Sequence, residues 1–185
     1  MNKAAILLAR GRLAEALESY GNAKKIFERE SMTSSLLYIA VLQAISDIKR
    51  FSGENENAAS LSKQAASIYE KISMTRSCMY AWSLLVSAED ILSLKNYGAA
   101  LNVFQKSSDA FSSCNLGMSK GAVLSEAQKA LCNYRLDNFD AALKGFSSAL
   151  KNAAALKIDN DENFAWFYRY TATILFEKKM DPESA

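Results

Sequence analysis

Apolar side chains recur along the chain at intervals of three and four residues, which is the spacing of one face of an α-helix. The pattern is clear near the N-terminus, in Leu13, Ala16, Leu17, Tyr20, Ala23, Ile26 and Phe27. Pro182 is the only proline, and the seven glycines are scattered. A protein of many short strands needs more turn residues than this. The pattern therefore predicts an all-α protein.

The helical pattern repeats with a constant period. One set of small residues, which we use as anchors, recurs with a 42-residue period: Ala16, Ala58, Ala100 and Ala142. A second set precedes the anchors at a fixed distance and continues one period further: Ala4, Ser46, Ala88, Ala130 and Ala172. Small side chains let two antiparallel helices approach closely, and aromatic side chains fill the space to the next pair. A single helix pair cannot bury both of its faces, so the repeats are expected to stack.

This register predicts two helices per repeat, which we name A and B. The A helices are expected near residues 2–10, 32–51, 74–94, 116–136 and 161–179. The B helices are expected near residues 12–29, 54–72, 96–113 and 138–157. Together they predict one right-handed α-solenoid of antiparallel hairpins over residues 1–185, with about four repeats and a final helix. The period places the start of the first A helix before residue 1, and residues 181–185 resemble the start of a fifth B helix. We therefore expect that this chain is an excerpt of a longer array.

Composition removes several classes of function. The net charge of +2 is too small to indicate nucleic-acid binding. No apolar run reaches the ~20 residues that a membrane-spanning helix needs. The chain contains no histidine, so His-dependent catalysis and His-containing metal sites are excluded. The remaining carboxylates form no catalytic pair, so we predict no enzymatic activity, no cofactor and no metal. The three cysteines are Cys78, Cys114 and Cys132. They are odd in number and form no CxxC pair, which favours buried free thiols in a cytoplasmic protein.

The repeat resembles the tetratricopeptide-like superfamily, although its period is longer than the usual length of about 34 residues. The residues that carry the resemblance are a small residue in helix A and a small, aromatic, small pattern in helix B. The third copy has Ala88, then Ala100, Phe104 and Ser107, and the fourth has Ala130, then Ala142, Phe146 and Ala149. The second copy departs from the pattern at Ser46 and Ser62. The resemblance implies a protein-interaction scaffold that binds a peptide or a helical segment in the groove lined by A helices.

Asp47 and Glu89 are the sharpest candidates for a binding site. Each directly follows the small residue of its A helix, so the two carboxylates hold equivalent positions in consecutive A helices, and Asp90 lies beside Glu89 in the sequence. A basic or amine-bearing peptide would be the ligand that complements these negative charges. The alternative is two solvated surface charges. Tyr38, Tyr80 and Trp82 are aromatic neighbours on A helices and could be groove anchors, although aromatic residues at helical spacing are more often core.

Three classes of function therefore remain. The first is the peptide-binding scaffold, and the second is a ligand-sensing regulatory module of a larger signalling or transcription protein. The third is self-association through the aromatic helix at residues 164–179, which carries Phe164, Trp166, Phe167, Tyr168 and Tyr170. No partner can be named from the sequence.

Overall fold

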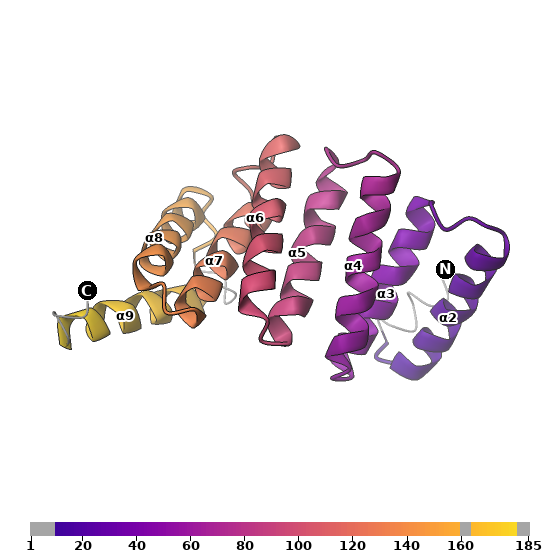
Figure 1. Ribbon diagram of the computed structural model, residues 1–185, viewed down its shortest axis with the longest axis horizontal. Helices are drawn as coiled ribbons and strands as arrows, with labels where there is room; N and C mark the ends of the chain where they lie inside the picture. Colours follow the sequence, from indigo (N-terminus) through magenta and orange to yellow (C-terminus); the bar gives the residue numbers. More distant parts are fainter. Residues whose placement is uncertain (1–9, 160–163, 181–185) are drawn as a thin grey trace. The chain divides into compact units, whose positions relative to one another are not determined.

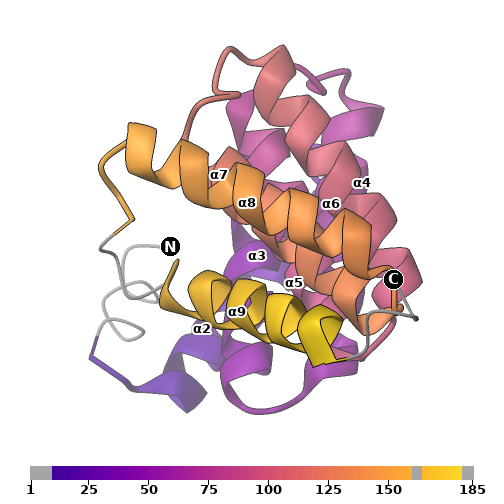
Figure 2. The ribbon, with the colours of Figure 1, turned by 90° about the vertical axis from the view of Figure 1, so that its left-hand side faces the viewer.

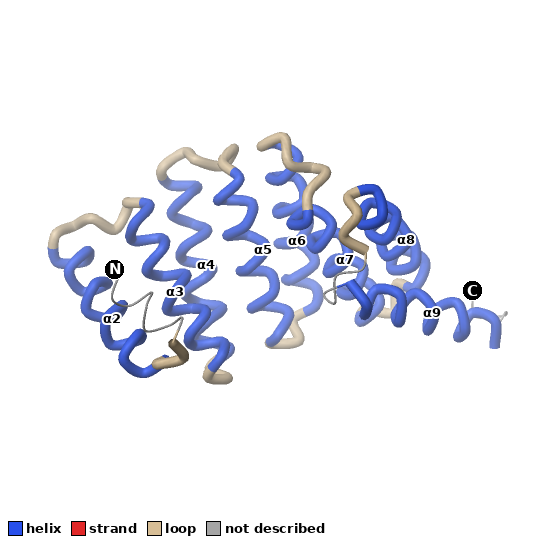
Figure 3. The backbone as a smooth tube through the Cα atoms, turned by 180° about the vertical axis from the view of Figure 1, so that it is seen from behind, coloured by secondary structure: helices blue, strands red, loops and turns tan. Residues whose placement is uncertain are grey.

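The computed structural model describes residues 10–159 and 164–180, with side chains up to residue 176. These residues form helices joined by turns, and no strand occurs among them (Figure 3). The helices are α2 (Leu13–Arg29), α3 (Leu36–Phe51), α4 (Asn55–Lys71), α5 (Cys78–Ser93), α6 (Tyr97–Ser113), α7 (Lys120–Arg135), α8 (Phe139–Ala155) and α9 (Ala165–Met180). The all-α prediction is confirmed. The expected first A helix and the expected start of a fifth B helix lie outside the described residues.

The helix starts repeat at the period read from the sequence. The B helices α2, α4, α6 and α8 begin at Leu13, Asn55, Tyr97 and Phe139, so successive starts keep the 42-residue period. The A helices α3, α5 and α7 begin at Leu36, Cys78 and Lys120, with the same period. None of these described helices is long and apolar enough to cross a bilayer.

The A helices begin four residues later than expected. The residues before them form a turn that contains a left-handed backbone conformation, at Ser31, Ser73 and Asn115. Each helix then starts after an N-cap serine, whose hydroxyl accepts a hydrogen bond from a backbone N–H of the first turn. The caps are Ser35, Ser77 and Ser119, and the donors are the amides of Tyr38, Tyr80 and Ala122. The predicted starts at 32, 74 and 116 were wrong because these residues belong to the turn.

The chain divides into two compact units, Met1–Thr75 and Arg76–Ala185, and we describe each by itself. In the first unit, α3 packs against both α2 and α4 (Figure 1). A core cluster of Ala16, Tyr20, Val41, Ile45 and Ile48 joins α2 to α3. The α3–α4 contact is close enough for the buried Ser46 hydroxyl to donate to the Ala58 carbonyl at 2.9 Å.

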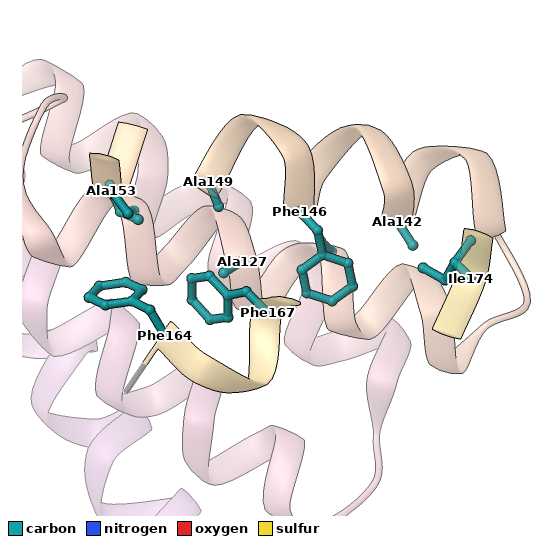
Figure 4. Packing of buried hydrophobic residues seen from close by; sticks show 10 residues of the cluster. Ala127, Ala142, Phe146, Ala149, Ala153, Phe164, Phe167 and Ile174 are labelled. Atoms are coloured by element: carbon teal, nitrogen blue, oxygen red, sulfur yellow. The ribbon is translucent and has the colours of Figure 1, made fainter. Parts of the chain in front are cut away.

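The second unit contains α5 to α9. Helix α6 packs between α5 and α7, and α8 packs between α7 and α9. Figure 2 shows α8 and α9 lying beside each other. Their shared core includes Phe146 of α8, Phe167 and Ile174 of α9, and Phe164 directly before α9, all fully buried (Figure 4). Ser107 of α6 connects this helix to both of its neighbours. Its hydroxyl donates to the Ala81 carbonyl of α5 at 3.0 Å and lies 3.0 Å from the Ser125 hydroxyl of α7.

Two of the three cysteines are not free thiols. Cys78 and Cys114 form a disulfide with a Cα–Cα distance of 5.5 Å, so the prediction of free thiols was wrong for this pair. Cys78 begins α5 and Cys114 follows the end of α6, and an antiparallel hairpin brings these two ends together. Cys132 is free and buried, as expected. Since disulfides are typical of oxidising compartments, these two cysteines no longer support a reducing location.

Candidate protein-binding surfaces

The six residues predicted for a binding site lie in both units. Asp47 and Tyr38 belong to α3 of the first unit, whereas Tyr80, Trp82, Glu89 and Asp90 belong to α5 of the second. The hypothesis that Asp47 and Glu89 face one common groove stays a prediction. The structure does show the surroundings of each residue within its own unit.

In the first unit, both predicted residues already have partners. Asp47 forms an ion pair with Arg50, one turn further along α3, and its side chain is 38% exposed. Tyr38 is 1% exposed, and its hydroxyl donates to the Glu28 carboxylate at 3.0 Å. Burial, and then this bond to Glu28, raises the pKa of Tyr38. Tyr38 therefore joins α3 to α2 and belongs to the core.

Glu28 has a second partner, the Lys24 ammonium group at 2.7 Å. The hydrogen bond from Lys24 is the main reason why the pKa of Glu28 is lowered, and the bond from Tyr38 adds to it. The carboxylate thus stays ionised and holds the Tyr38 hydroxyl in place.

In the second unit, the predicted residues separate into interior and surface. Tyr80 is 7% exposed and Asp90 is fully buried, so neither side chain is accessible. Trp82 is 42% exposed, and its ring meets Phe111 of α6 edge-on at 5.3 Å between centroids. Glu89 is half-buried. Only Trp82 and Glu89 therefore remain as surface candidates on α5.

Trp82 and Glu89 belong to a regular set of accessible positions that we call the A-helix face. The members on α5 are Trp82, Val86, Glu89 and Ser93, and the members on α7 are Leu124, Gln128, Leu131 and Arg135. Each is exposed or half-buried. Their spacing of four, three and four residues places them on one side of each helix. The two sets correspond at the 42-residue period, so the repeat presents one equivalent side of both A helices.

Gln128 adds a polar feature to the A-helix face. Its side-chain oxygen is buried and accepts no hydrogen bond from the described residues. Buried acceptors are usually satisfied, but an oxygen that is itself buried is not open to a partner on the surface. The sequence reading did not select Gln128, because a single glutamine on a helix carries no signal by itself.

A second accessible feature lies at the turn between α7 and α8. A hollow of about 380 Å³ is lined by Tyr134, Arg135, Asp137 and Phe139. Arg135 donates to the Tyr170 hydroxyl of α9 at 3.0 Å. Its guanidinium carbon lies 5.9 Å from the Tyr134 ring centroid and 5.8 Å from that of Tyr170, which is cation–π distance. An arginine held between aromatic rings can receive a carboxylate or stack on a planar group.

Two observations concern metal binding and thiol chemistry. No group of three or more His, Cys, Asp or Glu side chains among them is placed to hold a metal ion. Burial raises the pKa of the Cys132 thiol to about 12, so this thiol is protonated at neutral pH and is a poor nucleophile.

Comparisons with known proteins agree with this architecture. The tetratricopeptide repeat family model matches residues 1–71. No curated protein matches the chain. Two crystal structures of TPR-like repeats assigned to a Podosopora anserina kinesin light chain superpose with TM-scores of 0.79 and 0.78, at 12% identity over 98% of this chain and 86% of theirs.

Two further solved structures share the fold. BtubC (BKLC) from P. vanneervenii has a TM-score of 0.68 at 15% identity, over 91% of this chain and 66% of BtubC. The apo form of RapI has a TM-score of 0.74 at 16% identity, over 96% of this chain and 47% of RapI. This chain thus spans about half the length of RapI. The helix period, the match over residues 1–71 and these superpositions show that the chain has a tetratricopeptide-like helical-repeat fold.

Proposed function

We propose that the chain is a protein-interaction module that binds an extended or helical segment of another protein on its A-helix side. Tetratricopeptide-like repeats are generally protein–protein interaction modules and are generally not enzymes. The location of the bound segment is the part that we add to this general role.

The observation that carries the proposal is the accessible side that α5 and α7 present at equivalent positions, where four of the eight residues are apolar. Trp82, at 42% exposure, is the largest side chain on the A-helix face and is held by its contact with Phe111. A tryptophan that is already fixed loses little conformational freedom on binding, and tryptophan is enriched among the residues that dominate interface energies. Leu124 and Leu131 supply apolar surface at the matching positions of α7.

Polar groups would set the direction of the bound segment. Glu89 lies three residues beyond Val86 on the A-helix face and favours a basic or amine-bearing segment. Asp47, in the other unit, pairs with Arg50.

The test is affinity capture from a native extract, followed by measurement of the dissociation constant of the captured protein. We expect Trp82→Ala to raise this constant at least tenfold, which is about 1.4 kcal/mol. The double reversal Asp47→Lys with Glu89→Lys should also weaken a basic partner. The matched control is Met118→Ala, because Met118 is 55% exposed and lies before α7, outside the A-helix face.

Each outcome distinguishes the alternatives. A protein partner that binds both variants as well as the unaltered chain would show that the A-helix face is not its site. A co-purifying small molecule in place of a protein would favour the ligand-sensing regulatory module. Oligomers that grow with concentration, and no captured partner, would favour self-association through the last helix.

A further inference from the structure

The disulfide and the Trp82 ring contact join the same two helix ends. Cys78 is the first residue of α5, and Trp82 lies one turn further along the same side of that helix. On α6, Phe111 lies in the last turn, and Cys114 directly follows the end of the helix. The Cys78–Cys114 bridge and the edge-on contact of the Trp82 and Phe111 rings are therefore neighbouring links between α5 and α6, which lie side by side (Figure 1).

The segments that the disulfide joins contain no buried residue. Every side chain of residues 76–79 and 112–119 is exposed or half-buried, and this includes Cys78 and Cys114. Burial of apolar surface is the main force that orders a segment, and segments without it open locally at low free energy. The covalent bridge is therefore the strongest link between the end of α6 and the beginning of α5.

Phe111 connects this end of the hairpin to the A-helix face. Its ring is fully buried, and on one side it meets Trp82 at 5.3 Å between centroids. On α7, a Cβ atom added at Gly121 would lie 2.3 Å from Cζ of the Phe111 ring, so the ring fills the space that the glycine leaves. Phe111 thus contacts both helices of the A-helix face, at Trp82 of α5 and one turn before Leu124 of α7.

We propose that reduction of the Cys78–Cys114 disulfide releases Trp82 from its fixed orientation and thereby weakens binding at the A-helix face. The inference rests on the proposed function, because it concerns the same anchor side chain. When the bridge is open, the end of α6 moves relative to the beginning of α5, and the Phe111 ring no longer holds Trp82 in one place. A tryptophan that must be ordered on binding loses more conformational freedom, so the affinity falls.

A small-molecule thiol such as glutathione supplies the reducing equivalents. Its thiolate attacks one sulfur of the bridge, the S–S bond breaks, and the other cysteine leaves as a thiolate and takes up a proton. A second glutathione then displaces the first, which gives two protein thiols and one glutathione disulfide, so two electrons pass to the protein. Cys78 and Cys114 are half-buried and within reach of such a thiol, whereas Cys132 is fully buried.

The test follows Trp82 while the full chain is reduced. The chain has two tryptophans, so Trp166→Phe leaves Trp82 as the only one. Acrylamide quenching of its fluorescence is measured in buffers of different glutathione to glutathione disulfide ratio. We expect the quenching constant to rise at least twofold on reduction, at the same ratio at which thiol labelling detects Cys78 and Cys114. The indole N–H resonance of Trp82, identified by its loss in Trp82→Phe, should report the same transition in the unaltered chain.

Two cysteine variants are the matched controls. Cys78→Ser with Cys114→Ser should show the higher quenching constant in every buffer, and Cys132→Ala, which removes the free cysteine, should leave the transition unchanged. Equal quenching in the oxidised and the reduced chain would overturn the proposal, because the disulfide would then have no effect on Trp82. Loss of the helical circular dichroism signal on reduction would also overturn it, because the disulfide would then be required for the fold.

Binding distinguishes this proposal from the proposed function. The protein captured by the unaltered, oxidised chain should bind the reduced chain at least fivefold more weakly, and Trp82→Ala should remove this difference. A captured protein that depends on Trp82 but binds both forms equally would overturn the regulation and leave the proposed function standing. If quenching responds to reduction while the captured protein does not depend on Trp82, the proposed function is wrong and the control of Trp82 by the disulfide stands.

Discussion

At the scale of single residues, the turns that enter the B helices repeat one backbone conformation with different side chains. Gly11, Gly53, Lys95 and Asp137 recur with the 42-residue period and have positive φ values of 70°, 77°, 60° and 60°. Glycine adopts this left-handed region freely, whereas other L-residues lose about 1–2 kcal/mol there. The first two turns therefore have the residue that their geometry favours, and the next two do not.

Lys95→Gly should stabilise the protein by about 1 kcal/mol, because the left-handed conformation is retained and its steric cost is removed. The measurement is the urea midpoint of unfolding. Lys95→Ala is the matched control: it removes the same exposed charge but keeps a Cβ atom. If the alanine variant gains as much as the glycine variant, the effect is due to the charge and the backbone argument is wrong.

At the scale of helices, two glycines in helix interiors have opposite surroundings. A Cβ at Gly145 in α8 would meet the Ala130 Cβ at 2.8 Å, whereas a Cβ at Gly21 in α2 has nothing within 4 Å. Replacing glycine by alanine in an open helix gains about 1 kcal/mol of helix propensity. Overpacking a tight contact loses about 1–3 kcal/mol.

Gly145→Ala should therefore lower the free energy of unfolding by up to about 2 kcal/mol, and Gly21→Ala should raise it by up to about 1 kcal/mol. Chemical denaturation of both variants checks the two signs in one experiment. Stabilisation by Gly145→Ala would mean that α7 and α8 can move apart without loss, and that close approach is not what the small residues provide.

The sequence predicted the helices and their period well, and their beginnings less well. Small residues at fixed spacing mark the close contacts between helices, so the register follows from them. The N-caps Ser35, Ser77 and Ser119 recur with the same period, and this signal could have given the A-helix starts. It was missed because the preceding residues, such as Met32 and Met74, are compatible with a helix by propensity alone.

The candidate site was less predictable than the fold. Helical spacing shows which residues share a side of a helix, but not which side the neighbouring helices cover. Tyr38, Tyr80 and Asp90 were therefore kept as groove candidates, and all three are buried. The hollow beside Arg135 was missed for a different reason: its Tyr170 partner is 35 residues away and comes close only when α9 docks.

At the scale of the molecule, the repeat pattern extends through both units, but the disulfide is confined to the second. The two cysteines that form it are 36 residues apart, and Cys78 and Cys114 have no equivalent pair one period earlier or later. Nothing in the repeat could predict their pairing. A cross-link of this length is expected to stabilise the folded state by about 3–4 kcal/mol, chiefly by restricting the unfolded chain.

Breaking the disulfide should therefore destabilise α5 and α6 and leave α2 to α4 unchanged. Hydrogen exchange, measured with and without reductant, should become faster in residues 78–113 and stay the same in residues 13–71. Cys78→Ser should reproduce the faster exchange and respond no further to reductant.

Thiol titration of the denatured, unreduced chain gives an independent check, since one free thiol, that of Cys132, is expected. A titre of three thiols would contradict the disulfide, and faster exchange in both units would show that the cross-link stabilises more than its own hairpin.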